Sequence, residues 1–170
     1  MAKEQYTDAI ALLKADHREV EELFGKFERA SGDGKKQQIA EQICTELKIH
    51  AQIEEEIFYP ACEGKIEEDL LKEAYVEHDG AKVLIAEIEA GSPENEYYDA
   101  KVKVLSEQIE HHVEEEEMRM EGMFSQARRA GLDMDALGDQ LRARKEQLIA
   151  TYKVSGLPKP ETTTLDKVTV

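Results

Sequence analysis

The feature that most constrains this 170-residue chain is a series of four segments in which apolar residues recur at alternating intervals of three and four. That spacing puts them on one face of an α-helix, and four such helices bury their faces by packing together. The segments run from a cap at Thr7 to Phe27, over about 35–60, over about 67–90, and from after Pro93 to Phe124. The connections between them are short. The sequence therefore predicts an all-α, up-down-up-down antiparallel four-helix bundle.

The C-terminal part adds an appended helix and a tail. A fifth helix is predicted from about Asp135 to Tyr152, because one of its faces carries Leu137, Leu141 and Leu148. From Lys153 onward the composition favours turns and extended chain, so we expect a tail that is mobile or lies on the surface. A strand that binds a partner is the alternative. This divides the chain into a bundle over 1–130, an appended helix packed on it over 131–152, and an extended or disordered tail over 153–170.

Six positions on the apolar faces hold side chains that resist burial. They are His17, His50, Glu54, His78, His112 and Glu116. Burying unpaired groups of this kind costs several kcal/mol each, about 2–7 for a neutral polar group, so the set needs a shared explanation. Two His–Glu pairs have i, i+4 spacing, which offers a nitrogen and an oxygen from one helix face. The set predicts two transition-metal ions with terminal imidazoles and bridging carboxylates. A hydrogen-bonded polar core without metal is the alternative.

Neighbouring residues of similar type fall outside this pattern. Glu55, Glu115 and Glu117 turn away from the apolar faces by about 100° per residue, so we expect solvated side chains there. His111 lies in line with Glu115 and is predicted to be exposed or to contact a ligand residue. The sulfur-containing side chains Met118, Met120 and Met123 are expected to fill the core.

The charge balance restricts the choice of partners. With 22 Lys and Arg against 38 Asp and Glu, the net charge is -16, which disfavours nucleic acid and anionic membrane surfaces. Cations and small-molecule ligands are the expected partners. No stretch approaches the roughly 18–20 apolar residues that span a bilayer, and the N-terminal residues do not resemble a signal peptide. Cys44 and Cys62 lack the spacing of a disulfide-stapled domain, so we expect a cytoplasmic protein with reduced thiols.

Four stretches of the chain together resemble the hemerythrin-like, HHE cation-binding family. They are KADHREV around His17, HAQIEEEIFYP from His50, EHDGAKVL around His78 and EHHVEEEEM around His112. The resemblance covers roughly residues 7–125. It implies a non-haem di-iron centre with carboxylate and oxo bridges, in which one iron is held by His17 and His50 and the other by His78 and His112. Glu54 and Glu116 bridge the two irons in this assignment. Manganese or zinc would also accept such ligands.

The chain departs from oxygen-carrying hemerythrins in its third and fourth helices. In those proteins the third helix has the pattern HxxxH and the fourth has HxxxxD. Here Lys82 stands four residues after His78, and Glu116 stands four residues after His112. One histidine ligand is therefore missing, which implies exchangeable metal positions rather than reversible dioxygen carriage.

Two further side chains are expected near the metals. Tyr59, about one turn beyond Glu54, is predicted either to reach the site as a ligand or hydrogen-bond donor, or to pack at the end of the bundle. Lys82, one turn beyond His78, either places its amine near the site or extends to solvent.

These observations leave three functions open. The centre reacts with dioxygen, hydrogen peroxide or nitric oxide, for example with catalase-like activity; it acts as a non-catalytic iron or oxygen sensor or binding module; or the metal only staples the four helices. Nucleophilic catalysis has no support, because the sequence holds no nucleophile elbow or phosphate loop. Ferritin-like storage is disfavoured because its sites are richer in carboxylates.

Overall fold

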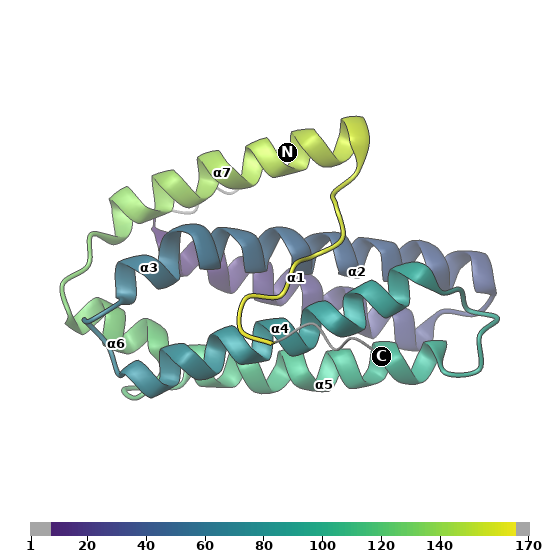
Figure 1. Cartoon of the computed structure of the whole chain (residues 1–170), viewed down its shortest axis with the longest axis horizontal. Coiled ribbons are helices and arrows are strands. Elements are labelled where there is room, and N and C mark those ends of the chain that lie inside the picture. Colours follow the sequence, from purple (N-terminus) through teal and green to yellow (C-terminus); the bar gives the residue numbers. More distant parts are fainter. Residues whose placement is uncertain (1–7, 166–170) are drawn as a thin grey trace.

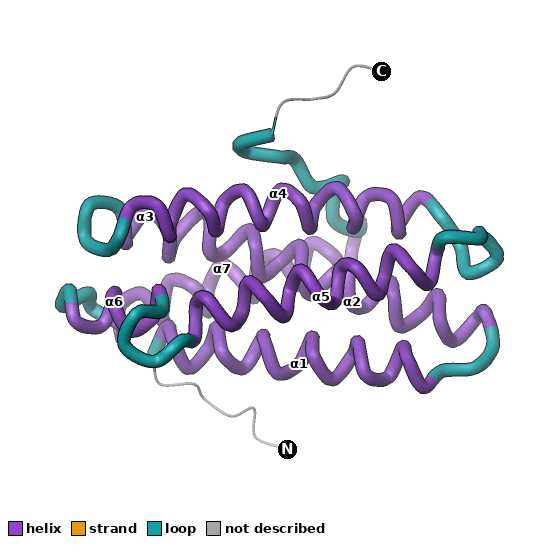
Figure 2. The backbone as a smooth tube through the Cα atoms, turned by 90° about the horizontal axis from the view of Figure 1, so that it is seen from below, coloured by secondary structure: helices purple, strands orange, loops and turns teal. Residues whose placement is uncertain are grey.

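Four long helices lie side by side and alternate in direction in the computed structural model, which describes residues 8–165 (Figure 1). They are α1 (Ala9–Arg29), α2 (Asp33–Ile53), α4 (Glu68–Ala90) and α5 (Tyr98–Glu117). Helix α1 packs against α2 and α5, and α4 packs against the same two helices, which closes the bundle. Figure 2 shows that the described part of the chain contains helices and loops without a strand. The all-α bundle predicted from the sequence is confirmed.

The residues at both ends of helix α1 explain where it begins and where it ends. The expected cap, Thr7, lies outside the described residues, and the carboxylate of Asp8 accepts a 2.8 Å hydrogen bond from the Ala11 amide. Such a cap satisfies an amide that has no partner within the helix. The helix ends at Arg29, shortly before Gly32, whose φ of 92° is easily reached only without a side chain.

The buried apolar residues form two clusters, one toward each end of the bundle. Along α1, Leu13 belongs to the first cluster and Val20 to the second, and along α2 the corresponding residues are Ile53 and Leu47. His17 and His50 lie between these pairs in the sequence. A polar layer therefore crosses the middle of the bundle, with apolar packing on both sides of it.

The second segment contains a π-helical turn that periodicity did not reveal. Helix α2 continues into η1 (Glu54–Phe58) and α3 (Tyr59–Cys62), and the Tyr59 amide bonds to the carbonyl of Glu54, five residues earlier. Pro60 contributes to this geometry because it has no amide hydrogen to continue the α-helical pattern. The wider turn brings Tyr59 back to the same face as Glu54.

The fourth segment ends earlier than predicted. Helix α5 stops at Glu117, and the chain turns through Met120, which has a φ of 69° and is 71% exposed, before the short helix α6 (Met123–Arg129). The expectation that Met118 and Met120 fill the core is therefore wrong, whereas Met123 is buried. Four consecutive acidic residues, 114–117, disfavour further helix because the negative end of the helix dipole lies there.

Helix α7 (Met134–Ser155) lies across α1, α2 and η1. Gly138 permits a close approach, since a Cβ atom there would stand 2.9 Å from the Ala9 amide nitrogen. After α7 the chain crosses over α2 toward α4 (Figure 1). No helix in the described part of the chain combines the length and the apolar character needed to span a bilayer.

Candidate metal centre

The structure brings the six polar residues predicted from the sequence into one buried layer. Their exposed fractions are 8% or less, and Glu54 is fully buried. They come from α1 (His17), α2 (His50), the π-helical turn η1 (Glu54), α4 (His78) and α5 (His112 and Glu116). All four bundle helices therefore contribute to one site.

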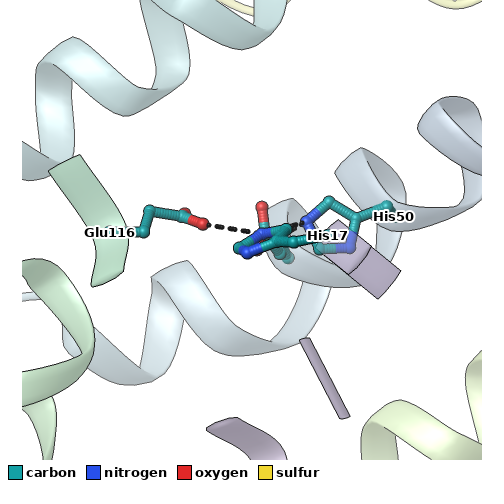
Figure 3. Close-up of side chains that lie close together, drawn as sticks. His17, His50 and Glu116 are labelled. Carbon is teal, nitrogen blue, oxygen red and sulfur yellow. Dashed lines mark hydrogen bonds and ion pairs between the residues drawn. The ribbon is translucent and has the colours of Figure 1, made fainter. Parts of the chain in front are cut away.

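The four histidines form two pairs whose Nε2 atoms face each other. The two Nε2 atoms are 3.2 Å apart in the His17–His50 pair and 3.1 Å apart in the His78–His112 pair. Figure 3 shows the first pair together with Glu116, whose carboxylate points at His17. These are the pairs that the family resemblance implies for the two irons.

The two glutamates each contact both pairs. Oε1 of Glu54 lies 3.0 Å from Nε2 of His50, and Oε2 lies 3.1 Å from Nε2 of His78. Oε2 of Glu116 lies 3.2 Å from Nε2 of His17, and Oε1 lies 3.3 Å from Nε2 of His112. Each carboxylate thus offers one oxygen atom to each histidine pair.

Carboxylates outside this layer fix the orientation of three imidazoles. Nδ1 of His17 lies 2.7 Å from Glu117, Nδ1 of His50 lies 3.1 Å from Asp16, and Nδ1 of His112 lies 2.5 Å from Glu77. A carboxylate accepts the Nδ1 hydrogen, so Nε2 is the ring nitrogen that can bind a metal once it has lost its own proton. The corresponding distance from His78 to Glu55 is 3.9 Å, too long for a hydrogen bond.

These carboxylates were missed from the sequence. Glu55 and Glu117 were expected to be solvated, but their side chains are 14% and 21% exposed, and Glu117 contacts His17. They turn away from the helix face, as the register requires, and so meet the outer side of the imidazoles. Asp16 and Glu77 immediately precede His17 and His78 in the chain. That adjacency was the available signal, although each contacts the histidine of another helix.

The inward-facing atoms fit a cation better than they fit one another. Nε2 atoms and carboxylate oxygens converge, and among the described residues Oε1 of Glu54 and Oε2 of Glu116 have no hydrogen-bond donor apart from the imidazoles at 3.0 and 3.2 Å. Donor atoms about 2.1 Å from one metal ion lie about 3.0 Å apart in octahedral geometry and about 3.4 Å apart in tetrahedral geometry. The observed separations of 3.0–3.3 Å match this range. The residues present therefore fit a pair of metal ions.

Without a metal, protons on the imidazoles compensate part of the negative charge of the buried glutamates. Burial lowers the pKa of His50, but the charge of Glu54 and the hydrogen bond to Asp16 outweigh burial and raise it to about 10. Burial and the neighbouring Glu116 raise the pKa of Glu54, yet His50 and His78 reverse this and lower it to about 2. A metal ion would have to displace the imidazole protons.

Tyr59 belongs to the His78–His112 side of the layer. Its hydroxyl lies 3.1 Å from Nε2 of His78 and 3.2 Å from Nε2 of His112, and it donates a 2.7 Å hydrogen bond to Oε1 of Glu116. The ring also packs edge-on against Tyr75. Burial and the two glutamates raise the pKa of Tyr59 well above its usual value. The ring of Tyr59 therefore packs against a neighbouring ring while its hydroxyl lies within hydrogen-bonding distance of residues in the polar layer.

Lys82 does not extend to solvent, which corrects one of the two interpretations of that residue. It is 7% exposed, and its Nζ atom lies 2.7 Å from Glu55 and 3.5 Å from Asp79. Two carboxylates stabilise its buried charge. Glu55 therefore connects Lys82 to the neighbourhood of His78 rather than facing water.

His111 lies outside the layer but is linked to it. Its ring is 63% exposed, and its Nε2 atom lies 3.3 Å from both Glu77 and Glu115. Glu77 in turn hydrogen-bonds His112. His111 is therefore exposed and contacts a residue that hydrogen-bonds His112.

One cavity of about 850 Å³ reaches the polar layer. The four histidines line it, and other parts of its wall are apolar and include Val20, Leu47, Ile85, Ile109 and Val113. The C-terminal segment from Leu157 to Thr164 also lines it. A small molecule can therefore approach the imidazoles from the α2–α4 side.

Comparison of this chain with known proteins also points to a helical domain of a cation-binding family. The family model for the hemerythrin HHE cation binding domain matches residues 8–124. The chain therefore belongs to the hemerythrin HHE cation-binding family.

One solved structure and one curated relative give further context. The crystal structure of a hemerythrin HHE cation binding domain-containing protein from Mycobacterium kansasii has a TM-score of 0.71, covering 88% of this chain and 94% of that one at 21% identity. This likeness shows the fold. A protein of Nostoc sp. named DNA nickase is 31% identical over 106 residues, or 62% of this chain. The matched part spans 30% of that protein's length.

Proposed function

We propose that this chain binds two non-haem iron ions and binds or reacts with a small oxygen or nitrogen species. The proposed ligands are His17, His50, Glu54, His78, His112 and Glu116. The observation that carries the proposal is that Glu54 and Glu116 each direct one oxygen to each histidine pair. Two iron ions held there supply redox chemistry toward dioxygen, hydrogen peroxide or nitric oxide, including peroxide decomposition.

Tyr59 is the seventh proposed ligand, on the His78–His112 side. Its hydroxyl stands at nearly the same distance from the two Nε2 atoms as they stand from each other, which is the spacing of donor atoms around one ion. In the metal-free protein the hydroxyl keeps its proton and donates a hydrogen bond to Glu116. Binding of a metal on this side would displace that proton, as it does those of the imidazoles.

The cavity and the charge of the chain support a small-molecule ligand. The cavity is lined by apolar side chains such as Val20 and Ile85 as well as by charged ones such as Glu55 and Lys82, so it offers a small uncharged molecule an apolar surface beside the imidazoles. The net charge of -16 disfavours nucleic acid and anionic membranes, so the activity named for the Nostoc relative is not extended to this chain. The buried free thiols of Cys44 and Cys62 are consistent with the cytoplasm.

Metal analysis with absorption spectra tests the proposal directly. We expect about two irons per chain and visible or near-ultraviolet charge-transfer bands that change on reduction with dithionite. His78→Ala should remove iron, whereas His111→Ala, at the exposed histidine, should retain it. A colourless protein that holds only zinc, or no metal, and folds equally well would refute the di-iron proposal in favour of a structural bundle.

A second candidate function, a non-catalytic sensor, is favoured by contacts between the site and the C-terminal part. Lys145 of α7 contacts Asp16, which contacts His50, and Asp79, next to His78, binds the segment after α7. A change at the centre would then reach these elements. The two candidates differ in turnover: steady consumption of peroxide or nitric oxide supports the first, and a ligand-dependent change in protease sensitivity without consumption supports the second.

A further inference from the structure

The segment Leu157–Leu165, here called the C-terminal strap, lies across the cavity that reaches the candidate metal centre. The chain reverses at Gly156, where φ is 71°, and then passes over α2 toward α4 (Figure 1). Strap residues Leu157 to Thr164 line the same cavity as the four histidines. The strap therefore lies where a molecule from solvent would enter between α2 and α4.

Asp79 anchors the far end of the strap. Its buried carboxylate accepts hydrogen bonds of 2.8, 2.5 and 2.9 Å from the amides of Thr163, Thr164 and Leu165, and one of 2.7 Å from the Thr164 hydroxyl. Hydrogen bonds to an ionised carboxylate are stronger than those between neutral groups. A single side chain of α4 thus fixes three consecutive residues that are more than eighty positions away in the sequence.

A second polar cluster and one apolar contact complete the attachment. The Thr163 hydroxyl donates a 3.0 Å hydrogen bond to Glu55, which pairs with Lys82. At the other end of the strap, Leu157 packs against the apolar cluster at the α7 side. Between these attachments, Pro158 and Pro160 restrict the backbone. The strap is therefore a short stiff span fixed at both ends across the opening.

The size of the cavity makes such a span consequential. A cavity of about 850 Å³ is within the range that holds drug-sized organic molecules, about 300–1,000 Å³. Dioxygen, hydrogen peroxide and nitric oxide have two to four atoms, so the cavity itself does not restrict entry to them. A size limit has to come from what covers the opening.

We propose that the C-terminal strap, anchored on Asp79, is the size-selective gate of this cavity. While Thr163, Thr164 and Leu165 are bound to Asp79, molecules of a few atoms reach the histidines, and bulkier organic molecules are held back. Asp79 and Thr164 are thus specificity-determining residues, which act through the strap and not on the reacting atoms. The purpose of the gate rests on the proposed function, but closure itself needs no metal.

A cysteine placed in the cavity reports access without relying on activity. Ala51 lines the cavity on α2, one turn from both Lys48 and Glu55, which pair with Glu89 and Lys82 of α4. In full-length Ala51→Cys protein, labelling rates are measured with two thiol reagents, methyl methanethiosulfonate as the small probe and a pyrene maleimide as the bulky one. The gate is then released with Thr164→Pro, which removes the amide hydrogen and the hydroxyl that bind Asp79. Asp79→Asn weakens the same anchor from the other side.

We expect either release variant to raise the maleimide rate at least tenfold, while the rate with the small reagent changes less than threefold. Amide hydrogen exchange at Thr163–Leu165 should accelerate in parallel, because these amides lose their acceptor. Val154→Ala, at an 88% exposed site before the strap, is the matched control and should change neither rate.

Two results would overturn the gate. One is equal maleimide labelling with the strap anchored and released. The other is that, in the release variants, Cys44, which is buried and does not line the cavity, is labelled to the same extent as the thiol introduced by Ala51→Cys, since that indicates global opening. Metal content is measured on the same samples. A protein without iron refutes the proposed function but leaves the labelling ratio as a valid test of the gate.

Discussion

Lys145 of α7 lies 2.5 Å from Oδ1 of Asp16, whose other oxygen lies 3.1 Å from Nδ1 of His50. The appended helix is thereby connected to the candidate metal centre through one carboxylate. Burial raises the pKa of Asp16, but its interactions with His50 and Lys145 outweigh burial and lower it, so the carboxylate stays ionised. An ionised acceptor at Nδ1 makes the opposite nitrogen of His50 a better metal ligand.

Asp16→Asn tests this connection. The amide keeps the shape of the side chain but removes its charge, so we expect metal affinity to fall about 10–100-fold with little change in helicity. Competition with a chelator of known affinity measures the loss. Glu22→Gln, on an exposed part of α1, is the matched control and should leave the affinity unchanged. Unaltered metal affinity in Asp16→Asn would show that Asp16 serves only to hold α7.

The pKa shifts in the centre predict opposite pH responses for metal-free and metal-loaded protein. The pKa of His50 is raised from 6.5 to about 10 when the metal is absent. Its contribution to the stability of the metal-free protein is therefore fully present below pH 6.5 and is lost as the pH rises through about 10. A metal ion must displace this proton, so metal affinity should rise with pH, by about tenfold per pH unit for each proton displaced.

Urea unfolding of metal-free protein from about pH 6 to about pH 10, beside chelator competition over the same range, checks both signs. We expect the unfolding midpoint of the metal-free protein to fall as the metal affinity climbs. Glu54, with a pKa lowered from 4.5 to about 2, adds stability above pH 4.5 that is lost as the pH falls through about 2. Metal affinity that does not vary with pH would contradict displacement of protons from these imidazoles.

Tyr59→Phe separates the two roles of that side chain. The ring packing is preserved and the hydroxyl near His78 and His112 is lost. If the phenol is a ligand, the iron-loaded variant lacks a visible phenolate-to-iron absorption band present in the parent, and unfolding free energy changes by only about 1–2 kcal/mol. Tyr75→Phe, which keeps the ring packed against Tyr59 and removes only its own hydroxyl, serves as the control. An unchanged spectrum would limit Tyr59 to a hydrogen bond with Glu116.

The sequence predicted the six central residues because helical periodicity carries that information. His17 continues the spacing of Leu13 and Val20, so its side chain had to enter the core whatever the details of packing. The residues that orient the imidazoles were missed for the opposite reason. Asp16 and Glu117 lie off the helix face, where acidic residues are common, and only the angle between two packed helices brings each to a histidine of another helix.

Features that depend on local exceptions to the α-helix, or on contacts distant in sequence, were also missed. The π-helical turn at Glu54–Phe58 leaves no mark on apolar spacing other than Pro60 after it. The burial of Lys82 depends on Glu55 and Asp79, and Asp79 is itself satisfied by Thr164 from the far end of the chain. A pattern read within one helix contains none of these pairings.

The turn between α5 and α6 supplies a prediction about how the centre is supported. Phe124 of α6 stacks on the ring of His17, with centroids 5.9 Å apart and planes inclined by 11°. Its position depends on Gly122, where a Cβ atom would clash with the carbonyl oxygen of Met118. Gly122→Ala must therefore displace the backbone. We expect it to lower the free energy of unfolding by about 1–3 kcal/mol and to weaken metal binding through His17.

Gly34→Ala, whose Cβ meets nothing within 4 Å near the start of α2, is the control and should instead be neutral or stabilising. Urea unfolding and chelator competition on the two variants measure both effects, and equal stability together with equal metal affinity of the two proteins would show that the turn does not position Phe124 against His17.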